Sequence, residues 1–193
     1  SAASVSADMN GMAVMLACKE LYDRLEPFRI KNPNGTLSEW AQAAYMERVN
    51  LTANGFYKTP DIGFNFDTNS GRLYAYSTSG VALTQVELDV LTGDHSILKS
   101  DLFMDIGNSI NYGIDIGQIE GGFMQGVGWS TTEELLLLSS DGSILTRGPN
   151  NYKIPSFKDI PQEFNIKILR GKKYHNLKTI KSSKATGEPP LFL

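Results

Sequence analysis

The sequence has little of several residue types, and each shortage excludes a class of protein. Cys18 is the only cysteine among 193 residues, so no disulfide forms within the chain, and this suits a reducing compartment. No apolar run approaches the roughly 20 residues of a membrane span, and we expect no membrane segment. Basic residues are not in excess, with 18 Lys and Arg against 21 Asp and Glu, which argues against a nucleic-acid partner. Neither His95 nor His175 has other ligands at metal-binding spacing, so we interpret both as surface residues.

Three stretches have helical patterns. The second is expected at residues 38–49 with Ser38 as its cap, and the third begins at Asp115, where Gln118 completes a variant of the capping box. The first follows Ser4 and Ser6 and is expected to end at Pro27. Its apolar residues share one helical face, which predicts a buried Cys18; they are Val14, Cys18, Leu21 and Leu25.

Between and after these helices the sequence predicts strands. Val86, Leu88 and Val90 alternate with charged residues, which is typical of a strand with one buried face. Thr-Gly-Asp at 92–94 predicts a turn into the next strand. Residues 171–175 indicate an exposed loop. Helices combined with hairpin-connected strands predict an α+β fold with mixed or antiparallel sheets; the expected strands are 55–58, 74–77, 81–91, 97–104, a short one near 144–146, and 164–169.

The sequence predicts a conformationally restricted backbone around one carboxylate near residue 193. Glu188 follows Gly187, which can adopt a positive φ, and precedes two prolines. Pro189 favours an extended backbone at Glu188, and Pro190 stiffens the residues after it. A general base benefits from such fixation, because misplacement by about 1 Å can cost roughly a hundredfold in rate. An ordinary loop is the alternative interpretation.

Other candidate sites lie at helix beginnings. Residues 1–6 combine small and hydroxyl side chains where free N–H groups suit an anion or a polar cofactor, or where a simple cap suffices. Gln118 offers an amide that can bind a ligand or only cap its helix. Glu133 and Glu134 are interpreted as a solvated helix end. Three glycines share a face that allows close packing against a strand or a cofactor; they are Gly117, Gly121 and Gly128.

Residues 182–193 read Ser-Ser-Lys-Ala-Thr-Gly-Glu-Pro-Pro-Leu-Phe-Leu, and this segment resembles the catalytic glutamate segment of the xanthine dehydrogenase family. Xanthine dehydrogenases are molybdenum hydroxylases related to aldehyde oxidases. Further landmarks of that family occur in its order, so the resemblance spans essentially the whole chain: Ser-Ala-Ala-Ser-Val-Ser at 1–6, Leu-Glu-Pro-Phe at 25–28, Thr-Asn-Ser-Gly at 68–71, Leu-Thr-Gly-Asp-His at 91–95, Asp-Ile-Gly-Gln-Ile-Glu-Gly at 115–121, Thr-Arg-Gly-Pro at 146–149 and Tyr-Lys-Ile-Pro at 152–155.

The resemblance implies that residues 1–193 are the C-terminal portion of a molybdopterin-binding domain within a longer chain. It implies hydroxylation of a purine, hypoxanthine to xanthine and xanthine to urate. In this family the glutamate at the position of Glu188 takes the proton from a hydroxide on molybdenum. The molybdenum–molybdopterin cofactor would contact Ala2, Ala3, Ser4, Ser6 and Gln118, with Ala3 beside the metal.

The resemblance also implies that a 2Fe–2S cluster, FAD and NAD are bound by other domains of the same polypeptide. It implies a homodimer in the cytoplasm or the peroxisome, and residues 1–193 alone are expected to be inactive. Pro189 and Pro190 favour purines, because the corresponding loop of aldehyde oxidases usually lacks this pair. Two alternatives stay open: hydroxylation of aldehydes and N-heterocycles as in aldehyde oxidase, and a non-enzymatic scaffold derived from the family.

Overall fold

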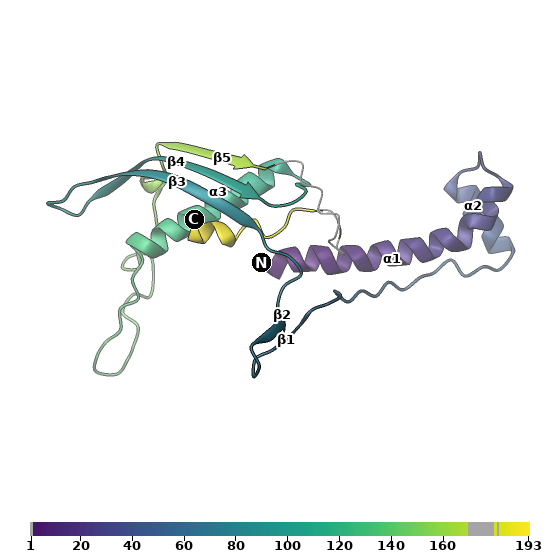
Figure 1. The fold of residues 1–193 in the computed structure, drawn as a ribbon, viewed down its shortest axis with the longest axis horizontal. Helices are drawn as coiled ribbons and strands as arrows, with labels where there is room; N and C mark the ends of the chain where they lie inside the picture. Colours follow the sequence, from purple (N-terminus) through teal and green to yellow (C-terminus); the bar gives the residue numbers. More distant parts are fainter. Residues whose placement is uncertain (1, 170–179, 181) are drawn as a thin grey trace. The chain divides into compact units, whose positions relative to one another are not determined.

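The computed structural model describes residues 2–169, 180 and 182–193, with side chains from residue 5 onward. The described chain forms two compact units, which Figure 1 shows as a ribbon. One unit contains residues 76–169 and 182–193, and the other contains residues 2–75 and 180. The loop expected at 171–175, with His175, lies outside the described residues, whereas His95 is exposed as expected.

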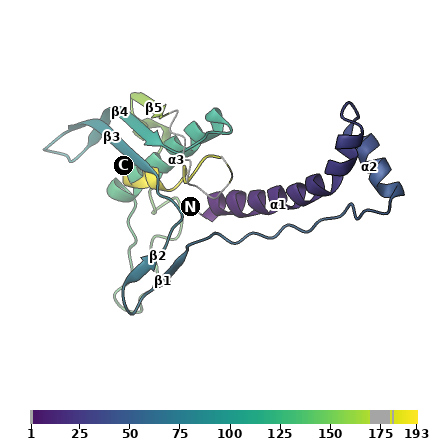
Figure 2. The same cartoon turned by 45° about the vertical axis from the view of Figure 1, so that its right-hand side comes forward.

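The first unit is built on a three-stranded mixed sheet. Its strands are β3 (Ser79–Leu88), β4 (His95–Asp105) and β5 (Glu163–Ile168), in the order β3-β4-β5. β3 runs antiparallel to β4, and β5 runs parallel to β4. Helix α3 (Tyr112–Thr131) lies across one face of this sheet (Figure 2). The predicted α+β class with mixed and antiparallel pairing is confirmed.

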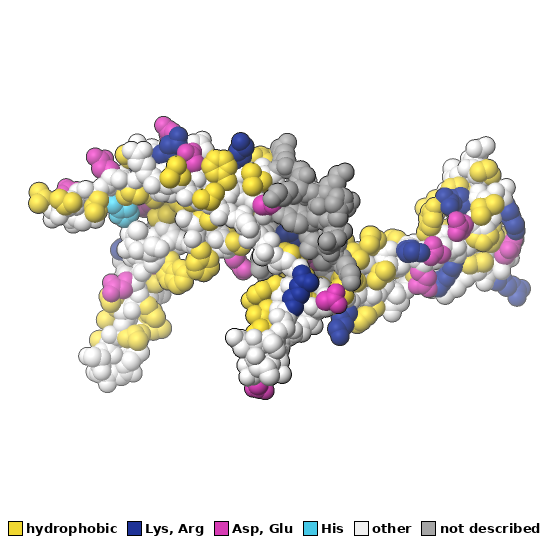
Figure 3. Space-filling model, in the orientation of Figure 1, with side chains coloured by type: hydrophobic (Ala, Val, Ile, Leu, Met, Phe, Trp, Pro, Cys, Tyr) yellow, Lys and Arg dark blue, Asp and Glu magenta, His cyan; other side chains and the backbone are white. Residues whose placement is uncertain are grey.

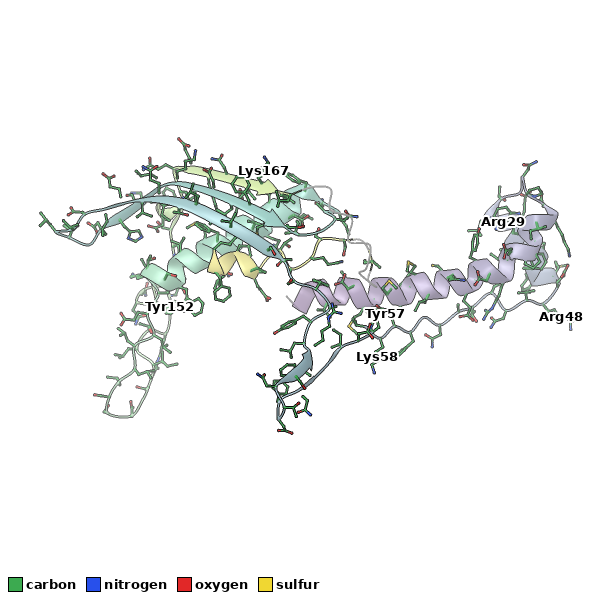
Figure 4. All side chains as sticks on the ribbon, viewed as in Figure 1. Arg29, Arg48, Tyr57, Lys58, Tyr152 and Lys167 are labelled. Atoms are coloured by element: carbon green, nitrogen blue, oxygen red, sulfur yellow. The ribbon has the colours of Figure 1, made fainter. Side chains whose placement is uncertain are left out.

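The core of this unit lies between the sheet and α3. Leu102, Met104 and Ile168 point from the sheet toward Ile119 and Phe123 of the helix, and all five side chains are buried. Burial of each such side chain contributes about 1.5–3 kcal/mol. On the opposite face of the sheet, the Lys167 ammonium lies 5.9 Å from the ring centroid of Phe103 (Figure 4).

The hairpin of β3 and β4 differs from the prediction in which side chains it buries. Val86, Leu88 and Val90 are 51%, 58% and 84% exposed, so the expected buried face is wrong. Alternation in the sequence shows that a strand has two different faces, but it does not show whether another part of the protein packs on either of them. Helix α3 packs against the other end of this hairpin. Figure 3 shows hydrophobic side chains gathered at the hairpin tip. The turn predicted at 92–94 is confirmed, with Gly93 at a φ of +83°.

The second unit pairs a long helix with a short one. Helix α1 (Ala2–Lys31) packs on α2 (Leu37–Met46) through buried Leu25, Phe28 and Ala44. A hairpin of β1 (Gly63–Asn65) and β2 (Ser70–Arg72) belongs to the same unit. Among the described residues, no helix combines the length and apolarity needed to cross a bilayer.

Helix α1 corrects two expectations. Pro27 lies inside the helix and does not end it. A proline removes one helical hydrogen bond, yet Leu25 and Phe28 flank it and are both buried, so packing against α2 holds the last turn. Cys18 is exposed, and Val14 is 62% exposed, because within this unit only the C-terminal part of α1 has a helix packed against it.

Several predicted boundaries are also corrected. The cap of α2 is Thr36 and not Ser38: its hydroxyl accepts from the Glu39 N–H, and the Glu39 carboxylate accepts from the Thr36 N–H, completing a capping box. Residues 55–58 and 74–77 are irregular rather than strands. Near 144–146 there is only one isolated bridge, Leu137 to Ile144. Two short 3₁₀ helices complete the described structure, η1 (Phe157–Asp159) and η2 (Pro189–Phe192).

Candidate functional site

The segment that leads to Glu188 is attached to the end of strand β4. Ser183 forms an isolated antiparallel bridge with Gly107, and the Lys184 N–H donates to the Ile106 carbonyl at 2.8 Å. The residues on either side of Ser183 are buried: Ser182 is 3% and Lys184 is 4% exposed. The start of this segment is therefore fixed in the interior of the first unit.

Lys184 is a buried cation four residues before Glu188, and sequence analysis did not single it out. Its ammonium donates to the Ser182 hydroxyl at 2.6 Å and lies 5.7 Å from the ring centroid of Tyr76. Lysines are almost never fully buried unless paired. No pattern in the sequence separates Lys184 from the exposed lysines, since its burial results from the bridge at Ser183.

A side-chain hydrogen bond joins this segment to helix α3. The Ser183 hydroxyl donates to Asp115 Oδ2 at 2.7 Å and accepts from the Ile110 N–H at 3.3 Å. Asp115 is 4% exposed. The cap of α3 is Asn111, whose side chain accepts from the Ile114 N–H at 3.2 Å. The helix therefore begins before Asp115, and the capping box predicted for Asp115 and Gln118 is wrong.

Further along, the segment lies directly on the surface of α3. A Cβ atom built on Gly187 would lie 2.8 Å from Gln118 Oε1. A Cβ built on Gly122 would lie far too close to the Gly187 carbonyl oxygen, and one on Gly126 too close to the Leu191 carbonyl oxygen. The glycines allow two backbones to approach more closely than any side chain permits.

These contacts correct the expected conformation around Glu188. Gly187 does not have a positive φ, and it lies close beside the end of the Gln118 side chain instead of forming a left-handed turn. Glu188 has φ −95° and ψ −39°, which is helical and not extended as Pro189 predicts. The reason is local: Glu188 is the N-cap of η2, and its carbonyl accepts from the Leu191 N–H at 3.1 Å. The positive φ lies instead at Ala185, at +47°.

The structure brings Gln118 and the Glu188 segment together, and both side chains are exposed. Within the described chain, no atom lies within 4 Å of a Cβ built on Gly117 or on Gly121. The first turns of α3 therefore present bare backbone next to an amide. Gly128 differs from these two glycines, because it lies against the ring of Pro155 and does not share their open space.

Glu133, interpreted as part of a solvated helix end, is half-buried instead. Its carboxylate accepts a hydrogen bond of 2.7 Å from the hydroxyl of Tyr152, which lies beyond the C-terminal end of α3 in Figure 4. This hydrogen bond raises the pKa of Tyr152, because it stabilises the protonated hydroxyl. Glu134 is exposed as expected.

The other predicted cofactor contacts belong to the second unit. Ala2, Ala3, Ser4 and Ser6 all lie within α1, which starts at Ala2, so the two serines do not precede the helix. Ser6 is exposed. That these four residues face the same cofactor as Gln118 stays a prediction.

Comparison with known sequences identifies the kind of protein that carries this arrangement. Residues 1–161 match the profile of a family described as the molybdopterin cofactor-binding domain. The whole chain is 52% identical to a xanthine dehydrogenase of Emericella nidulans and 55% identical to a xanthine dehydrogenase/oxidase of Felis catus. A xanthine dehydrogenase of Blastobotrys adeninivorans is 56% identical. The chain spans 14% of the length of each of these relatives.

Solved structures share the fold. An aldehyde oxidoreductase from Desulfovibrio desulfuricans superposes with a TM-score of 0.75 at 25% identity, over 96% of this chain and 19% of that chain. A carbon monoxide dehydrogenase from Oligotropha carboxidovorans gives a TM-score of 0.70 at 16% identity, over 94% of this chain and 24% of that chain.

Proposed function

We propose that this chain, which belongs to the molybdopterin cofactor-binding domain family, supplies part of the active site of a molybdenum hydroxylase that acts on purines. The observation that carries the proposal is the placement of Glu188. Its exposed carboxylate stands on a segment that is fixed to β4 and lies against α3 beside Gln118. The relatives named xanthine dehydrogenase, identical at more than half of the aligned positions, support the purine as substrate class.

The residues present fit the molybdenum cofactor. Gln118 provides an exposed amide that can donate and accept. Gly117 and Gly121 leave open space over the backbone of the same helix, where a flat polar ring system can approach closely. Ala2, Ala3, Ser4 and Ser6 would complete the binding site from α1, with Ala3 beside the metal. When bound, the cofactor would supply oxygen transfer and two-electron redox chemistry.

The chain's own contribution to the reaction is proton transfer. One carboxylate oxygen of Glu188 would accept the proton that the attacking oxygen loses as the substrate is hydroxylated. An ionised carboxylate only accepts hydrogen bonds and protons, which is the capacity that this role requires. The contact of Gly187 with Gln118 would hold this base at a set distance from the cofactor edge.

The other parts of the enzyme would come from outside these residues. Because the chain spans 14% of its relatives, we propose that residues 1–193 are a portion of a larger molybdopterin-binding domain. Other domains of the same polypeptide would carry the 2Fe–2S cluster, FAD and the NAD site. We propose a cytoplasmic homodimer, and the single cysteine agrees with a reducing compartment.

The substrate class is tested by comparing hypoxanthine with a simple aldehyde at equal molybdenum content. We expect the full-length protein to show the higher kcat/KM for hypoxanthine, because the Pro189–Pro190 pair that favours purines is built into η2. Steady-state kinetics with an artificial electron acceptor measures both. A higher kcat/KM for the aldehyde would reassign the chain to aldehyde oxidase chemistry, and no turnover of either would favour a scaffold.

Gln118 is expected to retain the cofactor more than to move protons. In the full-length protein, Gln118→Ala should lower molybdenum occupancy, while activity per bound molybdenum changes little, because the variant removes an amide and leaves Glu188 in place. Metal analysis of the purified protein together with turnover separates the two quantities. Gln125→Ala, also exposed on α3 but one turn beyond Gly121, is the matched control. Full occupancy with lost activity in Gln118→Ala would instead give this residue a catalytic role.

A further inference from the structure

Two polar side chains far apart in the sequence meet ahead of Glu188. Asp115 lies in the first turn of α3, and Ser183 lies five residues before Glu188. The Ser183 hydroxyl donates to Asp115 Oδ2 at 2.7 Å, and Asp115 is 4% exposed. A hydroxyl that donates to a carboxylate forms a charge-assisted bond, which is stronger than one between neutral groups. Burial shields this bond from competition with water.

The same helix then meets the segment again, on the other side of Ala185. Gly187 lies against Gln118, one turn along α3 from Asp115, and its carbonyl lies over Gly122, one turn further. Asp115, Gln118 and Gly122 are spaced by three and four residues, so they form one stripe on the helix. Both ends of residues 183–187 therefore contact one rigid element.

The rate of general-base catalysis depends on small changes in the position of the base, and these contacts fix the segment that carries Glu188. Misplacement of a catalytic group by about 1 Å can cost roughly a hundredfold in rate. Without the hydrogen bond from Ser183 to Asp115, the start of the segment would keep its bridge to Gly107 but lose a side-chain link to α3. Ala185 between the two fixed ends has a φ of +47°, a left-handed conformation that costs an alanine free energy and that the surrounding contacts must maintain.

We infer that Asp115 and Ser183 are positioning residues, which set the place of the Glu188 carboxylate relative to Gln118 on α3. This inference rests on the proposed function, in which Glu188 is the base. Neither residue would touch the substrate, and both would act through Glu188. Their removal should therefore lower kcat and leave the KM and the molybdenum content close to those of the unaltered protein.

The test uses Ser183→Ala in the full-length, cofactor-loaded protein. We expect kcat with hypoxanthine to fall about 10- to 100-fold, and Ser183→Thr, which keeps a hydroxyl, to recover most of the loss. Ser100→Ala is the matched control, because Ser100 is fully buried and its hydroxyl lies 2.8 Å from that of Thr84, within the sheet. It removes a buried hydroxyl of the same unit and should leave kcat unchanged.

A double-mutant cycle separates positioning from general damage. In the Glu188→Gln background, Ser183→Ala should lower the residual rate no further, because the group that it positions is already gone. An equal loss in both backgrounds, or an equal loss in Ser100→Ala, would overturn the inference while leaving the base assignment intact. Unchanged turnover in Glu188→Gln alone would overturn the base assignment itself, and the inference with it.

Discussion

Replacing Glu188 by glutamine is expected to lower the kcat of the full-length protein by about 10²–10⁴-fold, the usual effect of removing a general base. Glutamine has nearly the same shape as glutamate and cannot accept the proton. The Glu188 side chain is exposed at the N-cap of η2, so the packing of Pro190 and of the segment on α3 should survive. Molybdenum content and thermal stability should therefore match those of the unaltered protein.

The comparison requires a glutamate that is exposed but has no proposed role. Glu134, just beyond the end of α3, meets this condition, and Glu134→Gln should retain full activity. Turnover of hypoxanthine per bound molybdenum is the quantity to compare. If Glu188→Gln turned over at a rate near that of Glu134→Gln, the base would have to be another group.

A second large effect is expected from one added methyl group on α3. In Gly122→Ala, the new Cβ would overlap the Gly187 carbonyl oxygen and lie 3.2 Å from the Cβ of Pro190. The contacting atoms are backbone and a proline ring, neither of which can rotate away. Overpacking of this kind costs about 1–3 kcal/mol. The segment must move away from the helix, so kcat should fall by roughly a hundredfold or more.

The neighbouring glycine provides the control, because its surroundings are opposite. Within the described chain, no atom lies within 4 Å of a Cβ on Gly121, and alanine is favoured over glycine inside a helix by about 1 kcal/mol. Gly121→Ala should therefore keep or raise the melting temperature, whereas Gly122→Ala should lower it. Thermal unfolding of both full-length variants measures this, and Gly121→Ala is a control for stability alone because Gly121 borders the space proposed for the cofactor. Equal melting temperatures of the two variants would show that the close approach of Gly122 to Gly187 does not constrain the segment that carries Glu188.

The sequence predicts local elements well where their patterns are local. The β3–β4 hairpin, its turn at 92–94, β5 and the existence of α3 are all predictable from alternation, turn residues and helical spacing. The α+β class is predictable from these elements. The predicted boundaries are less accurate. Helix α3 begins at Tyr112, because Asn111 and not Asp115 caps it. The cap of α2 is Thr36 and not Ser38, although its capping box with Glu39 is a local pattern of the sequence.

Features that depend on distant residues could not be predicted. Continuation of α1 through Pro27 depends on α2, and the exposure of Val86 depends on where α3 packs. The hydrogen bond between Asp115 and Ser183 joins residues 68 positions apart, which no periodicity reports. The sequence predicts close packing at Gly117, Gly121 and Gly128, and the structure instead finds it at Gly122, Gly126 and Gly128, with Gly117 and Gly121 open.

For the candidate site, the sequence predicts the residues but not how they are held. Glu188 and Gln118 are separate predictions of the sequence, and the structure places Gly187 against Gln118 Oε1. The backbone around Glu188 differs from the predicted one. Gly187 is not left-handed and Glu188 is not extended, and packing on α3 fixes the segment instead. The roles of both side chains stay predictions.

The central claim is that Glu188 and Gln118 serve one site, the base beside the reacting atoms and the amide on the cofactor. An experimental structure of the full-length protein with cofactor and a slow purine substrate tests it most directly. We expect a Glu188 carboxylate oxygen within about 2.6–3.2 Å of a polar atom of the substrate or the cofactor's reacting centre, the reach of a general base. The Gln118 amide should hydrogen-bond the pterin in the same structure. A Glu188 carboxylate that points away from the cofactor, with another carboxylate in its place, would contradict the claim.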